Sequence, residues 1–237
     1  MHSNAYTLGF VFVVTAILGS ILSFTKINVR DLQDYNLKAD VKKNILRSLS
    51  FEEDVENPWT NDLVETIFSE NVQAFCVDKL GNKIDCVLED VDIEKNQSQH
   101  PVYIKVVDGD IAGIALPVAG KGLWSTIYGY IALEPDTDTV LGIQFYKHGE
   151  TPGLGGEVEK SWFINNFKGK KIRDIQEEII GIEVVKGKVN LENSKSIHQV
   201  DGISGATVTG RGVSIFIAED LKRYEEYLNK VRTSGTI

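Results

Sequence analysis

Charged side chains are missing from the first 25 residues, which contain no Asp, Glu, Lys or Arg. The lack of a basic start disfavours a cleaved signal peptide, because signal peptides usually begin with positive charge. From Leu8 to Phe24 the chain is almost continuously apolar, whereas a buried core helix is normally shorter and more amphipathic. About 17 to 19 helical residues match the thickness of a membrane core. The sequence therefore predicts a single transmembrane anchor over residues 1–26.

The chain also lacks an excess of basic residues. Its formal net charge is −9 at pH 7, which argues against a nucleic-acid binder because such a protein needs a basic face for phosphates. With 42% hydrophobic and 25% charged residues, the composition is that of an ordinary folded protein.

Cysteine and histidine are scarce. There are two cysteines and four histidines, without C-x-x-C or H-x-x-x-H spacing, so no metal site is expected. A G-x-G-x-x-G motif that opens a βαβ unit is also missing, which disfavours a nicotinamide site. Cys76 and Cys86 flank an expected hairpin turn at residues 80–82. They either form a disulfide in an oxidising compartment or remain two buried thiols.

Beyond the anchor, hydrophobic periodicity predicts helices and short strands. A helix is expected over residues 27–49, and Thr60 or Asn61 is expected to cap the next one. The expected strands are 74–79, 83–88, 102–107 and 111–116, followed by a hairpin over 128–148 that turns at 135–138. A short helix over 158–167, a strand-like segment over 177–187 and one long amphipathic helix from about residue 207 complete the order.

This order predicts an α+β fold with a mainly antiparallel sheet and flanking helices. We expect three regions: the anchor at 1–26, a helical linker region at 27–70 that packs on the domain, and the sheet domain at 71–237. Membrane orientation is a separate question. Five basic residues lie between positions 26 and 43 and none precedes the anchor, so the positive-inside rule places the C-terminal side in the cytoplasm.

The stretch DGISGATVTGRG, residues 201–212, precedes and begins the last predicted helix. Its glycines allow a tight backbone, and Thr207 or Thr209 is expected near the N-terminus of the helix. A helix N-terminus favours a phosphate, and Arg211 adds positive charge. The alternative is an ordinary capped helix after a turn, with the hydroxyls bonded to backbone N–H groups.

Two further segments are rich in glycine. HGETPGLGGE, residues 148–157, follows an expected strand, and a long loop of this kind is either functional or a plain surface turn. GKGLWSTIYGYIAL, residues 120–133, places Lys121 and Trp124 close to glycines. Trp124 either covers a flat ligand or packs in the core.

DGISGATVT resembles the flavinylation motif of FMN-binding domains, Asp-x-x-Ser/Thr-Gly-Ala-Thr. Asp201, Ser204, Gly205, Ala206 and Thr207 match the motif positions. The resemblance implies that the Thr207 hydroxyl is esterified to the phosphate of FMN by a separate flavin transferase that uses FAD as donor. The family often continues with Thr-Ser, where this chain has Thr-Gly.

With GLWSTIYGYIAL and HGETPGLGGEV, the whole chain resembles the NqrC family, whose members belong to the sodium-translocating NADH:quinone reductases. The alternative is the homologous flavin-carrying subunit of Rnf-type ferredoxin:NAD complexes. The resemblance implies a single-pass protein of the bacterial inner membrane with its FMN domain in the periplasm. This conflicts with the lysine asymmetry, and we follow the resemblance because one short segment is weak evidence for topology.

The resemblance also implies a role. The bound FMN would relay electrons from an upstream iron–sulfur centre to a second covalent FMN in a neighbouring subunit, while NADH and quinone bind elsewhere in the complex. A competing hypothesis is a membrane-tethered scaffold in which Thr207 only caps a helix. No catalytic residue is expected on this chain. The expected FMN contacts are Lys121, Trp124, Glu150, Thr151, Gly153, Leu154, Ser204, Gly205, Ala206, Thr207 and Val208.

Overall fold

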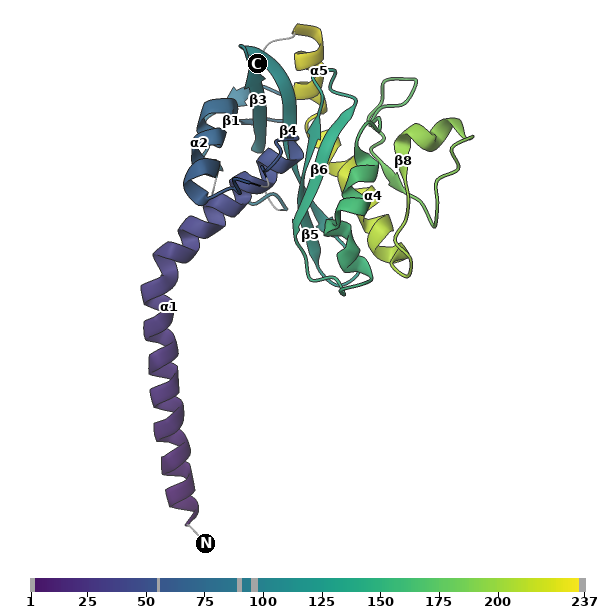
Figure 1. Ribbon diagram of the computed structural model, residues 1–237. Helices are drawn as coiled ribbons and strands as arrows, with labels where there is room; N and C mark the ends of the chain where they lie inside the picture. Colours follow the sequence, from purple (N-terminus) through teal and green to yellow (C-terminus); the bar gives the residue numbers. More distant parts are fainter. Residues whose placement is uncertain (1–2, 55, 89–90, 95–97, 235–237) are drawn as a thin grey trace. The chain divides into compact units, whose positions relative to one another are not determined.

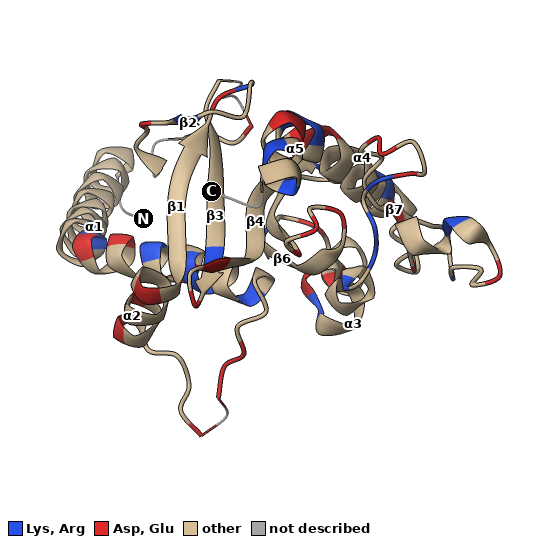
Figure 2. Cartoon of the chain, turned by 90° about the horizontal axis from the view of Figure 1, so that it is seen from above, with Lys and Arg blue, Asp and Glu red and all other residues tan. Residues whose placement is uncertain are grey.

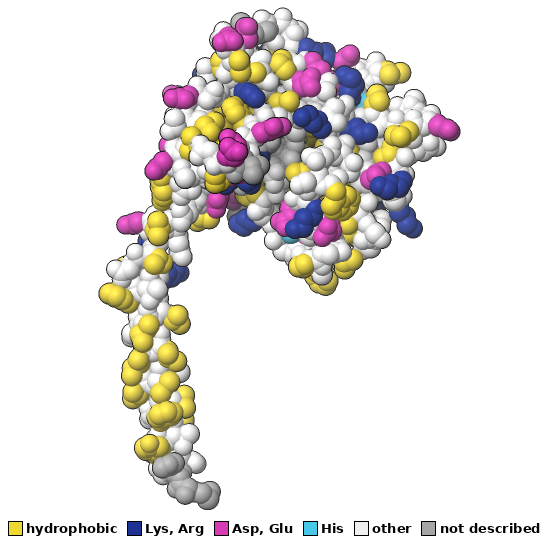
Figure 3. All heavy atoms as spheres, in the orientation of Figure 1, with side chains coloured by type: hydrophobic (Ala, Val, Ile, Leu, Met, Phe, Trp, Pro, Cys, Tyr) yellow, Lys and Arg dark blue, Asp and Glu magenta, His cyan; other side chains and the backbone are white. Residues whose placement is uncertain are grey.

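The computed structural model describes residues 3–54, 56–88, 91–94 and 98–234. Their contacts divide the chain into two compact units, Met1–Val41 and Lys42–Ile237. Helix α1, Asn4–Ser48, passes the expected boundary at residue 26 without a break. Within the described residues it is the one helix long and apolar enough to cross a membrane, and its most apolar 18-residue stretch has a mean hydropathy of 2.2. Figure 3 shows its N-terminal part covered by hydrophobic side chains.

The second unit is built on a six-stranded antiparallel sheet in the order β2-β1-β3-β4-β5-β6. The strands are β1 Val72–Val77, β2 Lys83–Ile84, β3 His100–Val107, β4 Asp110–Lys121, β5 Thr126–Leu133 and β6 Val140–Lys147. An N-terminal apolar helix followed by an antiparallel sheet with flanking helices confirms the expected fold class (Figure 1).

Helices and short segments flank this sheet. They are α2 Asn61–Asn71, α3 Ser161–Ile164, α4 Thr207–Arg223 and α5 Glu225–Ser234, with 3-10 turns η2 Gly155–Glu159, η3 Asn165–Phe167 and η4 Ser194–His198. Strands β7 Glu183–Val184 and β8 Gln199–Val200 pair in parallel beside α4. Thr60 caps α2 as expected, since its side chain accepts the Leu63 N–H. Figure 2 shows the acidic and basic residues mainly on the helices and loops, whereas the strands are largely uncharged.

The core lies between the sheet and α4. Alternate side chains of β4 and β5 face α4, because successive residues of a strand point to opposite faces. Ile114, Leu116 and Ile131 are fully buried in this layer, and each such side chain stabilises the fold by about 1.5–3 kcal/mol. Phe216 of α4 packs so closely on β4 that a Cβ atom on Gly120 would lie 2.2 Å from it. This packing fixes the position of α4.

Four expected elements differ in the structure. The expected strand at 83–88 forms only the two-residue β2, Lys83–Ile84. The sequence predicts one long last helix, but the helix breaks at Tyr224 (φ −100°, ψ 3°) into α4 and α5. The strand-like segment at 177–187 forms only the two-residue β7, and the expected helix at 158–167 is divided among η2, α3 and η3. The short segments have too few residues for their period to decide the structure, and a helix break of one residue leaves the apolar period of a long helix unchanged.

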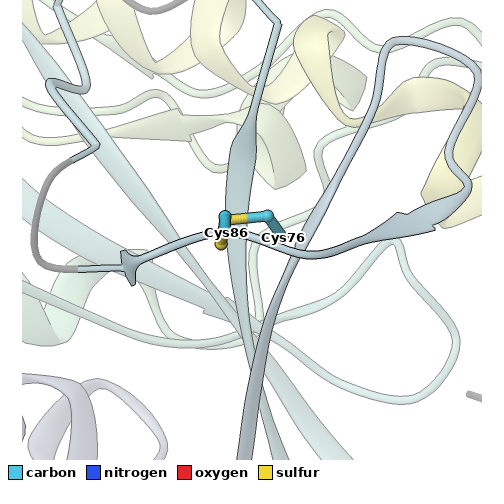
Figure 4. Close-up of a disulfide and its surroundings, with 2 residues drawn as sticks. All are labelled: Cys76 and Cys86. Carbon is cyan, nitrogen blue, oxygen red and sulfur yellow. A yellow bond between two sulfur atoms is a disulfide. The ribbon is translucent and has the colours of Figure 1, made fainter.

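The two cysteines form a disulfide (Figure 4), which decides between the two alternatives for them. Cys76 lies opposite Ile84 in the β1–β2 ladder, and Cys86 follows the end of β2. The Cα atoms of the pair are 6.0 Å apart. The bond therefore closes the short hairpin at the edge of the sheet.

Candidate functional site

Helix α4 begins at Thr207, directly after the turn of the DGISGAT segment. Gly205 has φ +75°, a backbone conformation that side chains other than glycine rarely adopt. The N-cap is Ala206, which has no polar side chain to cap the helix. In the part of the chain that the structure describes, the exposed Thr207 hydroxyl makes no hydrogen bond. Thr207 is therefore not a helix cap, and its hydroxyl lies free beside the helix N-terminus.

Thr209 lies in a different environment from Thr207. Residues two positions apart on a helix differ in direction by about 200°, so the two hydroxyls point to opposite faces of α4. Thr209 is 1% exposed, and its hydroxyl donates to Oε2 of Glu150 over 2.7 Å. Ser204 is exposed, like Thr207. The structure thus separates one buried, bonded hydroxyl from two accessible ones.

The Glu150 carboxylate joins α4 to the turn between β4 and β5. Its Oε1 accepts the N–H groups of Trp124 (2.8 Å) and Ser125 (3.2 Å), and its Oε2 accepts that of Leu123 (3.2 Å). Burial alone raises the pKa of Glu150, but the hydrogen bonds from the Thr209 hydroxyl and the backbone N–H groups together lower it by more, so the net shift is downward. The group is therefore a buried carboxylate held by the protein itself.

Glu150 belongs to the glycine loop 148–157, and the loop folds back so that Gly155 packs against its carboxylate. A Cβ atom on Gly155 would lie 2.6 Å from Glu150 Oε2 and 2.7 Å from the Thr209 hydroxyl oxygen, so only glycine fits there. At the loop tip, a Cβ atom on Gly205 would lie 2.8 Å from Cδ2 of Leu154. The glycine loop and the DGISGAT segment, far apart in sequence, therefore meet at Leu154.

The β4–β5 turn is the third segment of the site. A Cβ atom on Gly212 of α4 would lie 2.2 Å from the carbonyl oxygen of Lys121 at the end of β4. The Ser125 hydroxyl accepts the N–H of Gly149 over 2.6 Å. These contacts bring the turn, the glycine loop and the first turns of α4 together.

Asp201 of the motif has a clear partner within the chain. Its Oδ2 pairs with Lys188 at 2.6 Å, and its Oδ1 accepts the N–H of Val189 over 2.8 Å. The hydrogen bond from Lys188 is the main reason that the pKa of Asp201 is lowered. Asp201, the first residue of the motif, thus connects the end of β8 to the loop after β7.

The structure brings together the residues expected from the sequence. Most are exposed, and they come from the three segments just described: Lys121, Trp124, Thr151, Gly153, Leu154, Ser204, Gly205, Thr207 and Val208. Glu150 and Ala206 lie in the same place but are buried.

Sequence reasoning missed two residues of the site, Thr209 as a partner of Glu150 and Ser125 as a partner of the glycine loop. The helical spacing of Thr207 and Thr209 indicates that they face apart. Nothing in the sequence indicates which loop Thr209 meets.

The arrangement fits an FMN group. The free N–H groups of the first turn of α4 and its partial positive charge suit a phosphate beside Thr207. Trp124 (68% exposed), Leu154 (43%) and Val208 (57%) offer accessible apolar surface to a flat ring. Within the described residues there is no cluster of three His, Cys, Asp or Glu side chains that would hold a metal ion.

Comparison with known proteins agrees with this geometry. Residues 122–222 match the FMN-binding domain family. This range contains the β4–β5 turn from Gly122 onward, the glycine loop and the DGISGAT segment. The NqrC protein of Vibrio campbellii, from a Na(+)-translocating NADH-quinone reductase, is 32% identical over 261 aligned positions, covering 97% of this chain and 95% of the relative. The NqrC protein of Pseudomonas aeruginosa is 45% identical over 121 residues, covering 51% of this chain and 46% of the relative. The match to the Pseudomonas aeruginosa protein therefore spans about half of that protein's length.

Two solved structures share the fold. The crystal structure of NqrC from Parabacteroides distasonis ATCC 8503 superposes with a TM-score of 0.73 at 35% identity, covering 84% of this chain and 96% of that chain. The NqrC of Shewanella oneidensis superposes with a TM-score of 0.71 at 28% identity, covering 82% and 97%. These relatives favour NqrC over the Rnf-type alternative. The chain therefore belongs to the NqrC family of the Na(+)-translocating NADH-quinone reductases.

Proposed function

We propose that this chain carries FMN covalently on Thr207 and relays electrons inside a sodium-pumping NADH:quinone reductase complex. The observation that carries the proposal is the exposed Thr207 hydroxyl at the first residue of α4. It lies within the motif Ser204-Gly205-Ala206-Thr207 and within the match to the FMN-binding domain family.

The attachment is a phosphoryl transfer. The Thr207 Oγ1 forms a bond to the FMN phosphorus of FAD, the pyrophosphate P–O bond breaks, and AMP leaves with the electron pair. The hydroxyl proton must pass to a base. The hydroxyl of Thr207 has no partner among the described side chains, which supports a separate flavin transferase as the source of that base.

Binding and orientation are the work of this chain's own residues. The N–H groups at the start of α4 would hold the phosphate, and Ser204 lies next to it in the turn. Lys121, Trp124 and Val208 would border the ring, together with Thr151, Gly153 and Leu154 of the glycine loop. Once bound, FMN supplies reversible electron transfer, and the protein sets its position and electrostatic surroundings.

The proposed partners are the other subunits of the complex. An iron–sulfur centre would supply electrons and a second covalent-FMN subunit would accept them. We propose no site for NADH or quinone on this chain.

The apolar part of α1 supports a single membrane anchor. The disulfide between Cys76 and Cys86 supports a periplasmic domain, because disulfides persist in oxidising compartments and are rare in the cytosol. The disulfide therefore argues against the cytoplasmic orientation that the basic residues after the anchor predict.

In-gel fluorescence of the denatured chain tests the proposal. The chain is co-expressed with a flavin transferase as wild type, Thr207→Ala and Thr209→Ala. We expect fluorescent bands for the wild type and Thr209→Ala and a dark band for Thr207→Ala. A dark wild-type band would reject the covalent carrier and leave the membrane-tethered scaffold as the better account.

A further inference from the structure

Glu150 collects four hydrogen bonds from two distant parts of the chain. Each carboxylate oxygen accepts two: Oε1 from the Trp124 and Ser125 N–H groups, and Oε2 from the Leu123 N–H and the Thr209 hydroxyl. Glu150 is 26 residues from Trp124 and 59 from Thr209 in sequence. A single buried side chain thus connects the β4–β5 turn, the glycine loop and α4.

The surroundings of this carboxylate are closely packed. A Cβ atom on Gly122 would lie 2.7 Å from Oε1, and one on Gly155 would lie 2.6 Å from Oε2. Glu150 is only 5% exposed. A ligand atom that bonded this carboxylate would have to displace one of its four donors, so direct contact with a flavin ring is disfavoured.

We propose that Glu150 is a positioning residue, and that its bond to Thr209 sets the orientation of Thr207 relative to Trp124 and the glycine loop. The proposal rests on the proposed function and replaces the expected ring contact of Glu150 with a role through the protein. It assigns Thr209, the other hydroxyl in the first turn of α4, a function distinct from attachment.

Helix geometry explains why this bond acts on Thr207. The two threonines share the first turn of α4, so a rotation of that turn moves both hydroxyls together. The Thr209–Glu150 bond opposes such a rotation. The backbone of Glu150 is itself held, because its N–H donates to Nδ1 of His148 over 3.2 Å. The carboxylate therefore holds the first turn of α4, and with it Thr207, in one orientation.

The first test uses the full chain without flavin. Deuterium exchange followed by mass spectrometry is measured for peptides that cover residues 122–126 in wild type, Thr209→Val, Thr209→Ser and Glu150→Gln. Valine keeps the shape of threonine but not its hydroxyl. Glutamine places an NH2 group against backbone donors that need an acceptor.

We expect exchange in residues 122–126 to be about tenfold faster in Thr209→Val and Glu150→Gln, because a hydrogen bond to a charged group is worth at least that factor. Thr209→Ser should restore wild-type exchange. Unchanged exchange in both Thr209→Val and Glu150→Gln would overturn the proposal.

The second test uses the flavin-loaded chain and reads the visible circular dichroism of the bound flavin. Ser214→Ala is the matched control, because the Ser214 hydroxyl also joins α4 to another element by accepting the Val184 N–H over 2.8 Å. Its partner is β7 and not the flavin loops. Thermal unfolding reports the stability lost in each variant.

Thr209→Val should keep the covalent flavin but lose most of its visible dichroism, and Thr209→Ser should recover it. Ser214→Ala should lose stability and keep the wild-type spectrum. Equal spectral loss in Ser214→Ala and Thr209→Val would reduce the role of Thr209 to general stability and overturn the proposal. If the wild type carries no covalent flavin, the proposed function fails, and the exchange experiment still decides the positioning role.

Discussion

The backbone of Gly212 lies against the carbonyl oxygen of Lys121, so closely that a Cβ atom on the glycine would be 2.2 Å from that oxygen. The carbonyl belongs to the end of β4, and backbone atoms there cannot swing aside as a flexible side chain can. This contact sets how near the first turns of α4 approach the β4–β5 turn. The site depends on that approach, because Thr207 and Trp124 lie on its two sides.

Gly212→Ala should therefore lower the free energy of unfolding by about 1–3 kcal/mol, the usual range for overpacking. The variant should also carry less covalent flavin, because α4 has to move away from the turn. Urea unfolding measures the first effect and in-gel fluorescence the second. Glu219→Ala, at an exposed position of the same helix, is the control and should leave both values unchanged. Wild-type stability in Gly212→Ala would show that the contact relaxes without cost.

The disulfide should stabilise the folded domain. Cys76 and Cys86 are separated by 10 positions, and closing a loop of that size is worth about 2–3 kcal/mol in the chain-entropy account. The double variant Cys76→Ser with Cys86→Ser should lose that amount in chemical unfolding. A reducing agent should lower the thermal midpoint of the wild type and leave that of the double variant unaltered. An equal response of the two proteins would mean that the bond does not contribute to stability.

Asp220 predicts a pH-dependent stability. Its side chain is 2% exposed; Oδ2 accepts the Ala119 N–H over 2.7 Å, and Oδ1 pairs with Arg223 at 3.1 Å. Burial raises the pKa of Asp220 from 3.8 to about 6, although the Ala119 N–H and Arg223 lower it. The folded state therefore keeps a proton between these two pKa values that the unfolded state has lost. The stabilisation is complete below pH 3.8 and is lost as the pH rises through about 6.

The comparison of wild type with Asp220→Asn isolates this effect. The difference in unfolding free energy, wild type minus variant, should fall by up to roughly 3 kcal/mol between about pH 4 and 7. His100 lies in the same pocket and acts in the opposite sense, because burial lowers its pKa. It is present in both proteins and largely cancels in the difference. A difference that stays constant over this pH range would contradict a raised pKa for Asp220.

The fold was predictable from sequence where the pattern is long. The apolar start of α1, the longer strands β1 and β3 to β6 of the main sheet and the amphipathic α4 each repeat their period over many residues. The break at Tyr224 was not predictable, because a helix break of one residue leaves the spacing of the apolar residues unchanged. The parallel pair β7–β8 was not predictable either, because a two-residue strand has no period. The hairpin turn at residues 135–138 was predictable from its own residues, since Asp136 accepts the Thr139 N–H over 2.8 Å.

The site was predictable only in part. Thr207 and its motif follow from local sequence, and the exposed loops were recognisable from their glycines. The hydrogen bonds that connect these loops to α4 were not predictable, because the bond between Glu150 and Thr209 joins residues 59 positions apart. Hydrophobic periodicity indicates which face of a helix is buried, but not which polar group it meets there. Glu150 was therefore expected at the ring, whereas its four donors are all protein groups.

The central claim is that FMN is attached at Thr207, and peptide mass spectrometry tests it most directly. The full chain, co-expressed with a flavin transferase, is digested with trypsin and the peptide of residues 196–211 is fragmented. This peptide contains Ser196, Ser204, Thr207 and Thr209, so the fragments distinguish the four hydroxyls. We predict the mass of an FMN phosphoester on Thr207 and an unmodified peptide from Thr207→Ala. FMN on Ser204 or Thr209, or an unmodified wild-type peptide, would contradict the account.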